Sequence, residues 1–319
     1  MKVLITGVAG QDGIYLAEFM IANGFNVVGT VRNIKRAEEA LPQFLLGKIK
    51  LVAWDLLDQH RFCEILREHQ PVEVYNFAAY SSGVGMYDDP VNIADVNGLA
   101  VVRILEAIRE VNQKIRFCQA SSREVFGEAM ESPQTELTSC NPRSPYGAAK
   151  LYADHMIKIY CHRYNMFACS AILFNHESPL RRVEFVTRKI THEAVRIKLG
   201  FSKELRIGNL DTCRDWGYAG DYVKAMWMML QQEKPDSYII ATGQAHSVRD
   251  WCDLTFSFLG MDYKDYVIED EILYRPTEPC ILVGSPEKAL SILGWKPSLE
   301  FKGLVRMMVD SDLKLLTNS

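Results

Sequence analysis

The segment Lys2-Val-Leu-Ile-Thr-Gly-Val-Ala-Gly-Gln-Asp-Gly13 decides the fold, because it joins a short apolar strand to a turn that contains three glycines. An apolar pattern with helical spacing follows from Tyr15 to Met20. Glycines at such a strand-to-helix turn let the backbone approach a pyrophosphate, whose charge is stabilised by free N–H groups at the helix start. The spacing is GxxGxxG rather than GxGxxG. The segment predicts a dinucleotide-binding turn, with the cofactor contacted by Gly7, Gly10, Gln11, Asp12 and Gly13.

Strand and helix patterns alternate along the first half of the chain. Apolar strands are expected at residues 26–31, 48–54, 72–77, 115–118 and 167–174, with a helix at 95–110. This alternation predicts a Rossmann-type α/β fold with a doubly wound parallel sheet. We expect residues 1–174 to form the cofactor-binding domain, and 175–319 to form mainly a smaller α/β substrate-binding region, with the chain crossing back between the two. A capping box at Ser247 and Asp250 predicts a helix to residue 259, and 301–316 reads as a closing amphipathic helix.

The strand at 26–31 ends in Arg32, and no acidic residue follows it directly. An acidic residue there would bond the 2′-hydroxyl of NAD, whereas an arginine accommodates the 2′-phosphate of NADP. NADP is therefore favoured, with NAD possible, because an exposed Arg32 could simply be solvated. Asp55 and Leu56 follow the third strand, where the adenine edge is expected. Ala78 and its small neighbours after the fourth strand would let the nicotinamide ring lie close to the backbone.

Two polar clusters supply candidate catalytic groups. Ser122 and Glu124 follow the strand at 115–118, and ligands bind at the carboxyl ends of strands in open α/β sheets. Tyr146 and Lys150 are four residues apart and share one helix face. A phenol has a pKa near ~10, and a neighbouring ammonium favours its ionised form. Tyr146 is thus a candidate proton acceptor.

Composition narrows the class of protein. The 319 residues carry a net charge of -4 and no basic tract, which argues against a nucleic-acid partner. Eight cysteines are scattered without CxxC spacing, and the seven histidines show no metal-ligand spacing, so we expect reduced thiols and no metal. No apolar run reaches membrane-spanning length, and no signal-peptide pattern follows Met1. These features predict a soluble, cytoplasmic protein.

Cations in three separated segments could converge on a diphosphate, since arginine presents a planar fork to phosphate oxygens. The alternative is that they are solvated surface charges, and spacing alone favours neither. The segments are residues 175–189, residues 214–216 and residues 274–278.

Ordered motifs over nearly the whole length resemble the GDP-mannose 4,6-dehydratase family of the extended short-chain dehydrogenase/reductase superfamily. They are the glycine turn, Pro142-Arg-Ser-Pro-Tyr-Gly-Ala-Ala-Lys150, Ile172-Leu-Phe-Asn-His-Glu-Ser-Pro179, Phe185-Val-Thr-Arg-Lys189, Gly208-Asn-Leu-Asp211, Arg214-Asp-Trp-Gly217, Arg275-Pro-Thr-Glu278 and Gly294-Trp-Lys-Pro297. The resemblance implies a GDP-sugar substrate, either mannose or a manno-heptose, and a transient hydride transfer to NADP. It implies that Ser122, Glu124, Tyr146 and Lys150 form the catalytic set. It also implies that the nucleotide diphosphate is held by Asn175, Lys189, Arg214, Arg275 and Glu278.

Three departures from the family pattern bear on this reading. Arg123 stands beside Glu124 where the family has a serine, so it could alter the base, pair with a substrate group or point outward. The loop that serves tetramer formation is missing after Arg32, so we expect a homodimer. The segment before Arg275 is shorter than in the dehydratases, and Ser82, next to Ser81, replaces a histidine near the sugar; both serines are candidate substrate contacts.

Two other functions stay open on the sequence. One is a reductase or epimerase acting on a GDP-4-keto-6-deoxy sugar, in which Tyr146 and Lys150 act but Glu124 does not eliminate water. The other is a non-catalytic protein that binds the nucleotide sugar or NADP. Glu124 favours the dehydratase over the first alternative, and the intact Ser122, Tyr146 and Lys150 argue against the second.

Overall fold

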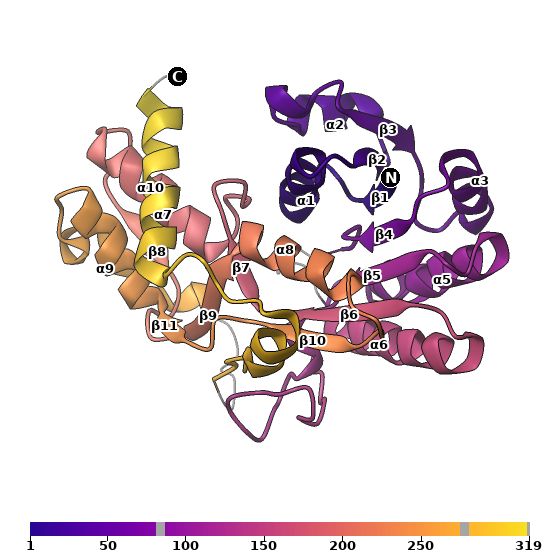
Figure 1. Ribbon diagram of the computed structural model, residues 1–319. Helices are drawn as coiled ribbons and strands as arrows, with labels where there is room; N and C mark the ends of the chain where they lie inside the picture. Colours follow the sequence, from indigo (N-terminus) through magenta and orange to yellow (C-terminus); the bar gives the residue numbers. More distant parts are fainter. Residues whose placement is uncertain (81–86, 275–280, 318–319) are drawn as a thin grey trace.

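A seven-stranded parallel sheet forms the centre of the computed structural model, which describes residues 1–80, 87–274 and 281–317 (Figure 1). The strand order is β10-β6-β5-β4-β1-β2-β3. The strands are β1 (Lys2–Thr6), β2 (Asn26–Val31), β3 (Ile49–Ala53), β4 (Glu73–Asn76), β5 (Arg116–Ala120), β6 (Ala168–Leu173) and β10 (Ser237–Ile240). The order reverses direction between β1 and β4, so the carboxyl ends of these strands flank the crevice where such sheets bind ligands.

Helices cover both faces of this sheet, which explains why its strands are apolar runs rather than alternating patterns (Figure 1). One face packs against α1 (Gln11–Ala22) and α8 (Ala219–Leu230). The other packs against α3 (Gln59–His69), α5 (Ala100–Val111) and α6 (Pro145–Tyr164). The predicted doubly wound Rossmann-type fold is confirmed.

The strands predicted from the sequence are present, and four of them differ from the prediction only at their ends. Strand β10 was not predicted, because four residues next to a polar turn give too short a pattern to separate from a loop. It pairs in parallel with β6 at the edge of the sheet. The chain therefore leaves the sheet after β6 and returns to it with α8 and β10, so residues on both sides of position 174 build it.

The helix predicted at 95–110 is longer and is divided into three parts. It begins as α4 (Pro90–Ala94), widens into the π-helical segment η2 (Asp95–Leu99) and continues as α5. Asn97 in the π-helical segment is buried and bonds both backbone groups of Tyr80: its Oδ1 accepts from the Tyr80 N–H at 3.0 Å, and its Nδ2 donates to the Tyr80 carbonyl at 3.2 Å. The widened turn thus fixes the chain just after β4.

A second core lies beside the sheet and is built mainly from residues after 185. It gathers apolar side chains from α7 (Val186–Lys198), α9 (Val248–Phe258) and α10 (Phe301–Thr317). The predicted capping box at the start of α9 is confirmed, with Ser247 and Asp250 bonding each other's backbone N–H groups. Two small sheets border this core: β11 (Ala245–Ser247), β9 (Cys213–Tyr218) and β7 (Asn175–Glu177) form one, and β12 (Val267–Glu269) and β8 (Leu205–Ile207) form the other. The remaining short elements are α2 (Ile34–Ala40), η1 (Gln43–Leu45), η3 (Arg123–Val125), η4 (Tyr263–Asp265), η5 (Glu271–Leu273) and η6 (Ala289–Leu293).

Candidate active site

The glycine turn between β1 and α1 is packed so closely that Gly7 and Gly13 leave no room for a side chain. Gly7 has a φ of 65°, and a Cβ atom there would lie 2.9 Å from the Ala78 nitrogen. A Cβ atom at Gly13 would lie 2.5 Å from the Gly7 carbonyl oxygen. Gly10 precedes α1, and no side chain caps the helix start. The turn therefore offers backbone N–H groups next to Ala78, as a dinucleotide pyrophosphate requires.

A buried polar network crosses the carboxyl ends of three neighbouring strands. The Thr6 hydroxyl donates to Asn76 Oδ1 at 2.5 Å, Asn76 Nδ2 donates to Gln119 Oε1 at 2.7 Å, and Gln119 Nε2 donates to the Ala120 carbonyl at 2.8 Å. The same carbonyl accepts from Lys150 Nζ at 2.8 Å. The network fixes the strand ends relative to α6, because each buried polar group depends on its neighbour.

The four predicted catalytic residues come together at the carboxyl end of β5. Tyr146 and Lys150 lie in the first turns of α6, which begins after the capping residue Ser144. Gly147 lets η3 approach this helix, since a Cβ atom there would lie 2.5 Å from the Glu124 carbonyl oxygen. Ser122 caps η3, and its side chain makes a hydrogen bond to Tyr146.

Burial sets the acidity of the Tyr146 and Lys150 side chains. Burial raises the pKa of Tyr146 to about 12, although its hydrogen bond with Ser122 acts in the opposite direction. Burial also lowers the pKa of Lys150 to about 8. Lys150 Nζ lies 5.6 Å from the centre of the Tyr146 ring and donates to the Ala120 carbonyl instead. Lys150 alone therefore does not make Tyr146 a phenolate at neutral pH, so the ionised form needs a further positive charge.

Arg123 turns inward and pairs with the candidate base. Its Nη2 lies 2.9 Å from Glu124 Oε1, and the two side chains are 8% and 19% exposed. The possibility that Arg123 points outward is thus excluded. Its guanidinium is placed either to act on Glu124 or to meet a substrate group beside it.

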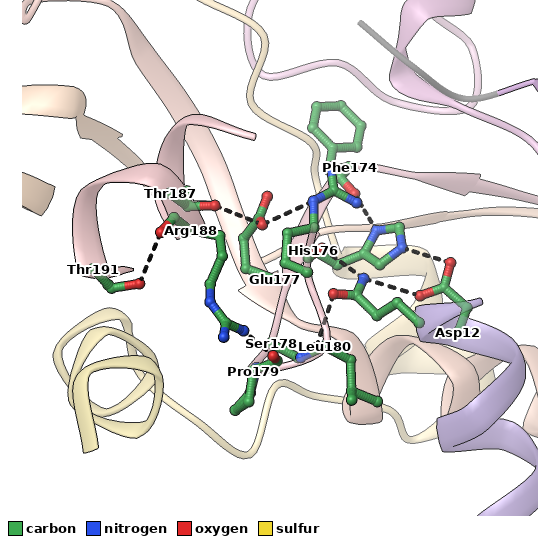
Figure 2. A network of polar contacts seen from close by, with 12 residues as sticks. Asp12, Phe174, His176, Glu177, Ser178, Pro179, Leu180, Thr187, Arg188 and Thr191 are labelled. Carbon is green, nitrogen blue, oxygen red and sulfur yellow. Dashed lines mark hydrogen bonds and ion pairs between the residues drawn. The ribbon is translucent and has the colours of Figure 1, made fainter. Parts of the chain in front are cut away.

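A second polar network joins the start of α1 to β7 and the segment after it (Figure 2). Asp12 Oδ2 lies 3.0 Å from His176 Nε2, and Gln11 bridges to the His176 carbonyl at 3.1 Å and to the Ser178 hydroxyl at 2.8 Å. Burial disfavours both charges, but the pairing outweighs it, lowering the pKa of Asp12 and raising that of His176. The pairing therefore favours the charged form of both side chains.

Arg181 extends this network toward the catalytic residues. Its guanidinium lies 3.5 Å from the centre of the Phe185 ring, and its Nε lies 3.1 Å from the buried Glu177 carboxylate. Its charge lowers the pKa of both Asp12 and Tyr146, so the guanidinium acts on the cofactor turn and on the catalytic residues together. Sequence reasoning assigned no role to His176, although it lies in a motif that carried the family resemblance. It placed Arg181 only among the cations of residues 175–189 that could converge on a diphosphate.

The other predicted residues occupy more scattered positions. Asn175 begins β7, and its buried Oδ1 has no hydrogen-bond partner among the described residues. Lys189 Nζ donates to the Arg206 carbonyl at 2.7 Å, and Arg214 donates to the Cys213 carbonyl at 2.7 Å. At the cofactor end, Arg32 and Asp55 are exposed, and Leu56 packs against the core. Four predicted substrate contacts, Ser81, Ser82, Arg275 and Glu278, lie outside the described residues.

The described residues show neither a cluster suited to a metal ion nor a helix suited to a membrane. Residues 1–80, 87–274 and 281–317 hold no group of three or more His, Cys, Asp or Glu arranged for a metal ion. Across those ranges, no helix has both the length and the apolar character needed to cross a membrane.

The parallel sheet, the glycine turn and the Ser122, Tyr146 and Lys150 side chains at the sheet edge define an extended short-chain dehydrogenase/reductase. Solved structures share this fold. UDP-glucose 4-epimerase from Thermotoga maritima has a TM-score of 0.88 at 22% identity and covers 99% of this chain and 100% of its own. The Thermus thermophilus enzyme with NAD has a TM-score of 0.83 at 26% identity and covers 98% of this chain and 99% of its own.

Sequence comparison identifies the family. The protein-family model described as GDP-mannose 4,6 dehydratase matches residues 4–308 of this chain. The chain therefore belongs to this family. GDP-mannose 4,6 dehydratase 2 of Arabidopsis thaliana is 44% identical over 98% of this chain and 87% of its own length. The Homo sapiens relative is 42% identical, with coverage of 98% and 91%, and the Vibrio cholerae relative is 41% identical, with 98% and 94%.

Proposed function

We propose that this protein is a GDP-mannose 4,6-dehydratase, a lyase that converts the GDP-sugar to its 4-keto-6-deoxy form. The observation that carries the proposal is the gathering of Ser122, Glu124, Tyr146 and Lys150 at one strand end, in a chain that matches this family over nearly its full length. Such a site combines one base that takes a proton from a hydroxyl group, Tyr146, with a second base that takes a proton from carbon, Glu124.

A nicotinamide cofactor supplies, when bound, the temporary removal of hydride from the sugar and a positive charge beside Tyr146. Tyr146 would take the proton of the sugar 4-hydroxyl, while Ser122 bonds the same oxygen and holds its position. The resulting C4 ketone acidifies the C5 proton, which Glu124 would remove as water leaves C6. Tyr146 and Ser122 would keep hold of the C4 oxygen while C6 receives the hydride that the bound cofactor would supply and C5 takes a proton from solvent.

The residues of the cofactor turn fit a dinucleotide, and we propose NADP rather than NAD. The close packing at Gly7 and the uncapped start of α1 support pyrophosphate binding. Arg32 is exposed at the end of β2, where the 2′-phosphate of NADP would approach. Asp55, Leu56 and Ala78 are the proposed contacts to adenine and nicotinamide. Arg32→Ala should weaken NADP+ binding more than NAD+ binding in calorimetric titrations, and equal losses for both would argue against this role.

For the GDP-sugar we propose contacts from β7, α7 and β9. Asn175 has a buried carbonyl oxygen suited to a donor from the ligand, and Lys189 and Arg214 supply positive charge for the diphosphate. Ser81, Ser82, Arg123, Arg275 and Glu278 complete the proposed set. A manno-heptose in place of mannose is compatible with the same nucleotide contacts.

We also propose a cytoplasmic homodimer whose cofactor domain, residues 1–174, lies beside a substrate-binding region, residues 175–319. Exposed apolar side chains along α6 and its neighbour η2, including Tyr152 at 42%, Ile159 at 51% and Leu99 at 43%, support a second copy on this face. Light scattering should give the mass of a dimer.

The activity is tested by incubating purified protein and NADP+ with GDP-mannose or a GDP-manno-heptose and following the products by mass spectrometry. Loss of one water, with a 4-keto group formed, is the expected result, and the faster sugar identifies the substrate. If only a GDP-4-keto-6-deoxy sugar with NADPH reacts, the reductase or epimerase alternative replaces the dehydratase. Binding of cofactor and GDP-sugar without any conversion would select the non-catalytic alternative.

A further inference from the structure

Asp154 is a buried carboxylate on the catalytic helix, one turn after Lys150. It is 7% exposed, and its two oxygens accept hydrogen bonds from hydroxyls on two different strands. The Ser121 hydroxyl, at the end of β5, donates to Oδ2 at 2.6 Å, and the Ser170 hydroxyl, on β6, donates to Oδ1. Two hydroxyl donors, one for each oxygen, are the partners expected of an ionised carboxylate.

Asp154 and Lys150 are four residues apart on α6, so they share one helix face, and the charge of Asp154 acts on the buried ammonium of Lys150. Burial lowers the pKa of Lys150, and the Asp154 charge is the influence that raises it again. Burial likewise raises the pKa of Asp154, which Ser121, Ser170, Lys150 and Lys158 oppose, and the Cys140 thiol also lies within its electrostatic reach. Burying a carboxylate is costly, whereas the two hydroxyls would need only a neutral acceptor. A carboxylate at position 154 is therefore better explained by the positive charge of Lys150, which it stabilises, than by the two hydroxyls.

Asp154 also reaches the catalytic turn through the backbone. Ser121, which it bonds, lies between Ala120, whose carbonyl accepts from Lys150, and Ser122, which bonds Tyr146. Through this arrangement Asp154 connects α6 to the end of β5 that carries the other half of the site. A shift of Ser121 would move the Lys150 acceptor and Ser122 together.

We propose that Asp154 is a positioning residue for the dehydratase reaction, which keeps Lys150 in its ammonium form and holds the Ala120 to Ser122 turn against α6. The inference rests on the proposed function, because Lys150 serves Tyr146 during proton transfer. The ammonium form of Lys150 must persist while Tyr146 takes the substrate proton. Asp154 thus sets the upper pH limit of the reaction.

The electrostatic part is tested by Asp154→Asn with a readout that needs no substrate. NMR of protein containing lysine labelled with 13C at Cε, with the Lys150 signal assigned by its loss in Lys150→Met, gives the titration of this group directly. Wild type should titrate near pH 8. Asp154→Asn should lower the proton affinity of Lys150 about tenfold or more. The control Asp221→Asn removes a buried carboxylate on α8, which accepts from the backbone N–H and the hydroxyl of Ser298, and it should leave the titration unchanged. An unchanged Lys150 titration in Asp154→Asn overturns this part.

The positional part is tested by a matched pair that keeps the charge. Ser121→Ala and Ser170→Ala each remove one hydroxyl donor to Asp154, but only Ser121 adjoins the catalytic turn. Ser121→Ala should lower kcat several-fold more than Ser170→Ala, with KM unchanged and the alkaline limb of the kcat profile in place. Equal kcat values for the two variants overturn the positional part, and this pair serves even where Asp154→Asn does not fold.

The same pH profiles separate the inference from the function. In Asp154→Asn the alkaline limb of kcat should move to lower pH in step with the Lys150 titration. A moved titration with an unmoved limb overturns the link to catalysis. A moved titration in a protein that converts no GDP-sugar contradicts the proposed function and leaves the assignment of Asp154 to Lys150 intact.

Discussion

At the scale of single residues, the site depends on charges held in places that disfavour them. Burial raises the pKa of Tyr146, so its phenol stays protonated until a positive charge lies nearby. Burial lowers the pKa of Lys150, so its ammonium loses its proton more easily than an exposed lysine does. Such perturbed groups cluster at functional sites because catalysis needs them near their switching point. Reactivity is gained here at the expense of stability.

Lys150→Met should stabilise the fold while abolishing activity. Because the folded pKa of Lys150, about 8, lies below its unfolded value of 10.5, the charged form costs about 3 kcal/mol below pH 8, and this cost disappears as pH rises toward 10.5. Loss of the hydrogen bond to the Ala120 carbonyl and of the Asp154 partner offsets part of the gain, leaving about 1 kcal/mol at pH ~7. Urea unfolding at neutral and alkaline pH measures it. Lys158→Met, at an exposed lysine on the same helix, is the control. The prediction would be contradicted if Lys150→Met gained less stability over wild type at neutral pH than at alkaline pH.

Glu124→Gln should separate the two halves of the reaction. The amide cannot take the C5 proton, so oxidation at C4 proceeds and water is retained, leaving a 4-keto sugar with its 6-hydroxyl and reduced cofactor. Rapid-quench mass spectrometry and nicotinamide absorbance follow both. Normal dehydration by this variant removes Glu124 from the mechanism.

Arg123 is tested in the same assay. Its ion pair at 2.9 Å holds one oxygen of Glu124, and we expect the other oxygen to face the substrate. Arg123→Ser, which restores the residue of the family pattern, should keep C4 oxidation and slow water loss by roughly tenfold if the guanidinium only orients Glu124. Arg123→Lys is the charge-retaining control. A changed sugar preference without slower elimination would assign Arg123 to the substrate instead.

At the scale of elements, contacts between α1 and β7 connect the cofactor turn to the rest of the site. The ionic Asp12 and His176 pair makes this contact, with Gln11 and Ser178 beside it (Figure 2). The pair thus connects the glycine turn to the segment that carries Arg181.

Asp12→Asn should destabilise the protein in a pH window defined by both partners. The raised pKa of His176 means that its contribution is complete below the unfolded pKa and is lost as pH rises through the folded pKa. The lowered pKa of Asp12 means that its contribution is lost as pH falls through the folded pKa. Between these limits we expect a loss of about 1–3 kcal/mol for a largely buried pair. Unfolding curves across pH measure this loss; one that persists unchanged at high pH would contradict an ionic pair.

Elements with a strong local signal could be predicted from the sequence, and those defined by partners could not. The glycine turn at Gly7 and the capping box at Ser247 specify local structure by themselves. Strand β10 is a strand only because β6 lies beside it, and the pairing of Asp12 with His176 joins residues far apart in sequence. Likewise the YxxxK spacing predicted that Tyr146 and Lys150 share a helix face, but not that Lys150 would donate to the Ala120 carbonyl, since this depends on how deeply α6 is buried.

At the scale of the whole molecule, a seven-stranded sheet with its glycine turn is accompanied by a second core, beside which we propose the substrate contacts. The strands β1, β4 and β5 are parallel neighbours, and the candidate catalytic residues Ser122 and Glu124 follow the carboxyl end of β5. We propose that this arrangement lets one bound sugar face both the cofactor and two bases. Its consequence is that a single hydride should move within one substrate molecule.

The central claim is therefore tested most directly by GDP-mannose carrying deuterium at C4, converted by the protein with NADP+ in ordinary water. The account predicts a 4-keto-6-deoxy product with the deuterium at C6, because the hydride removed from C4 is returned to the same molecule, and NMR of the product locates the label. Deuterium that remains at C4, or that is released with free reduced cofactor while no label reaches C6, would contradict the account.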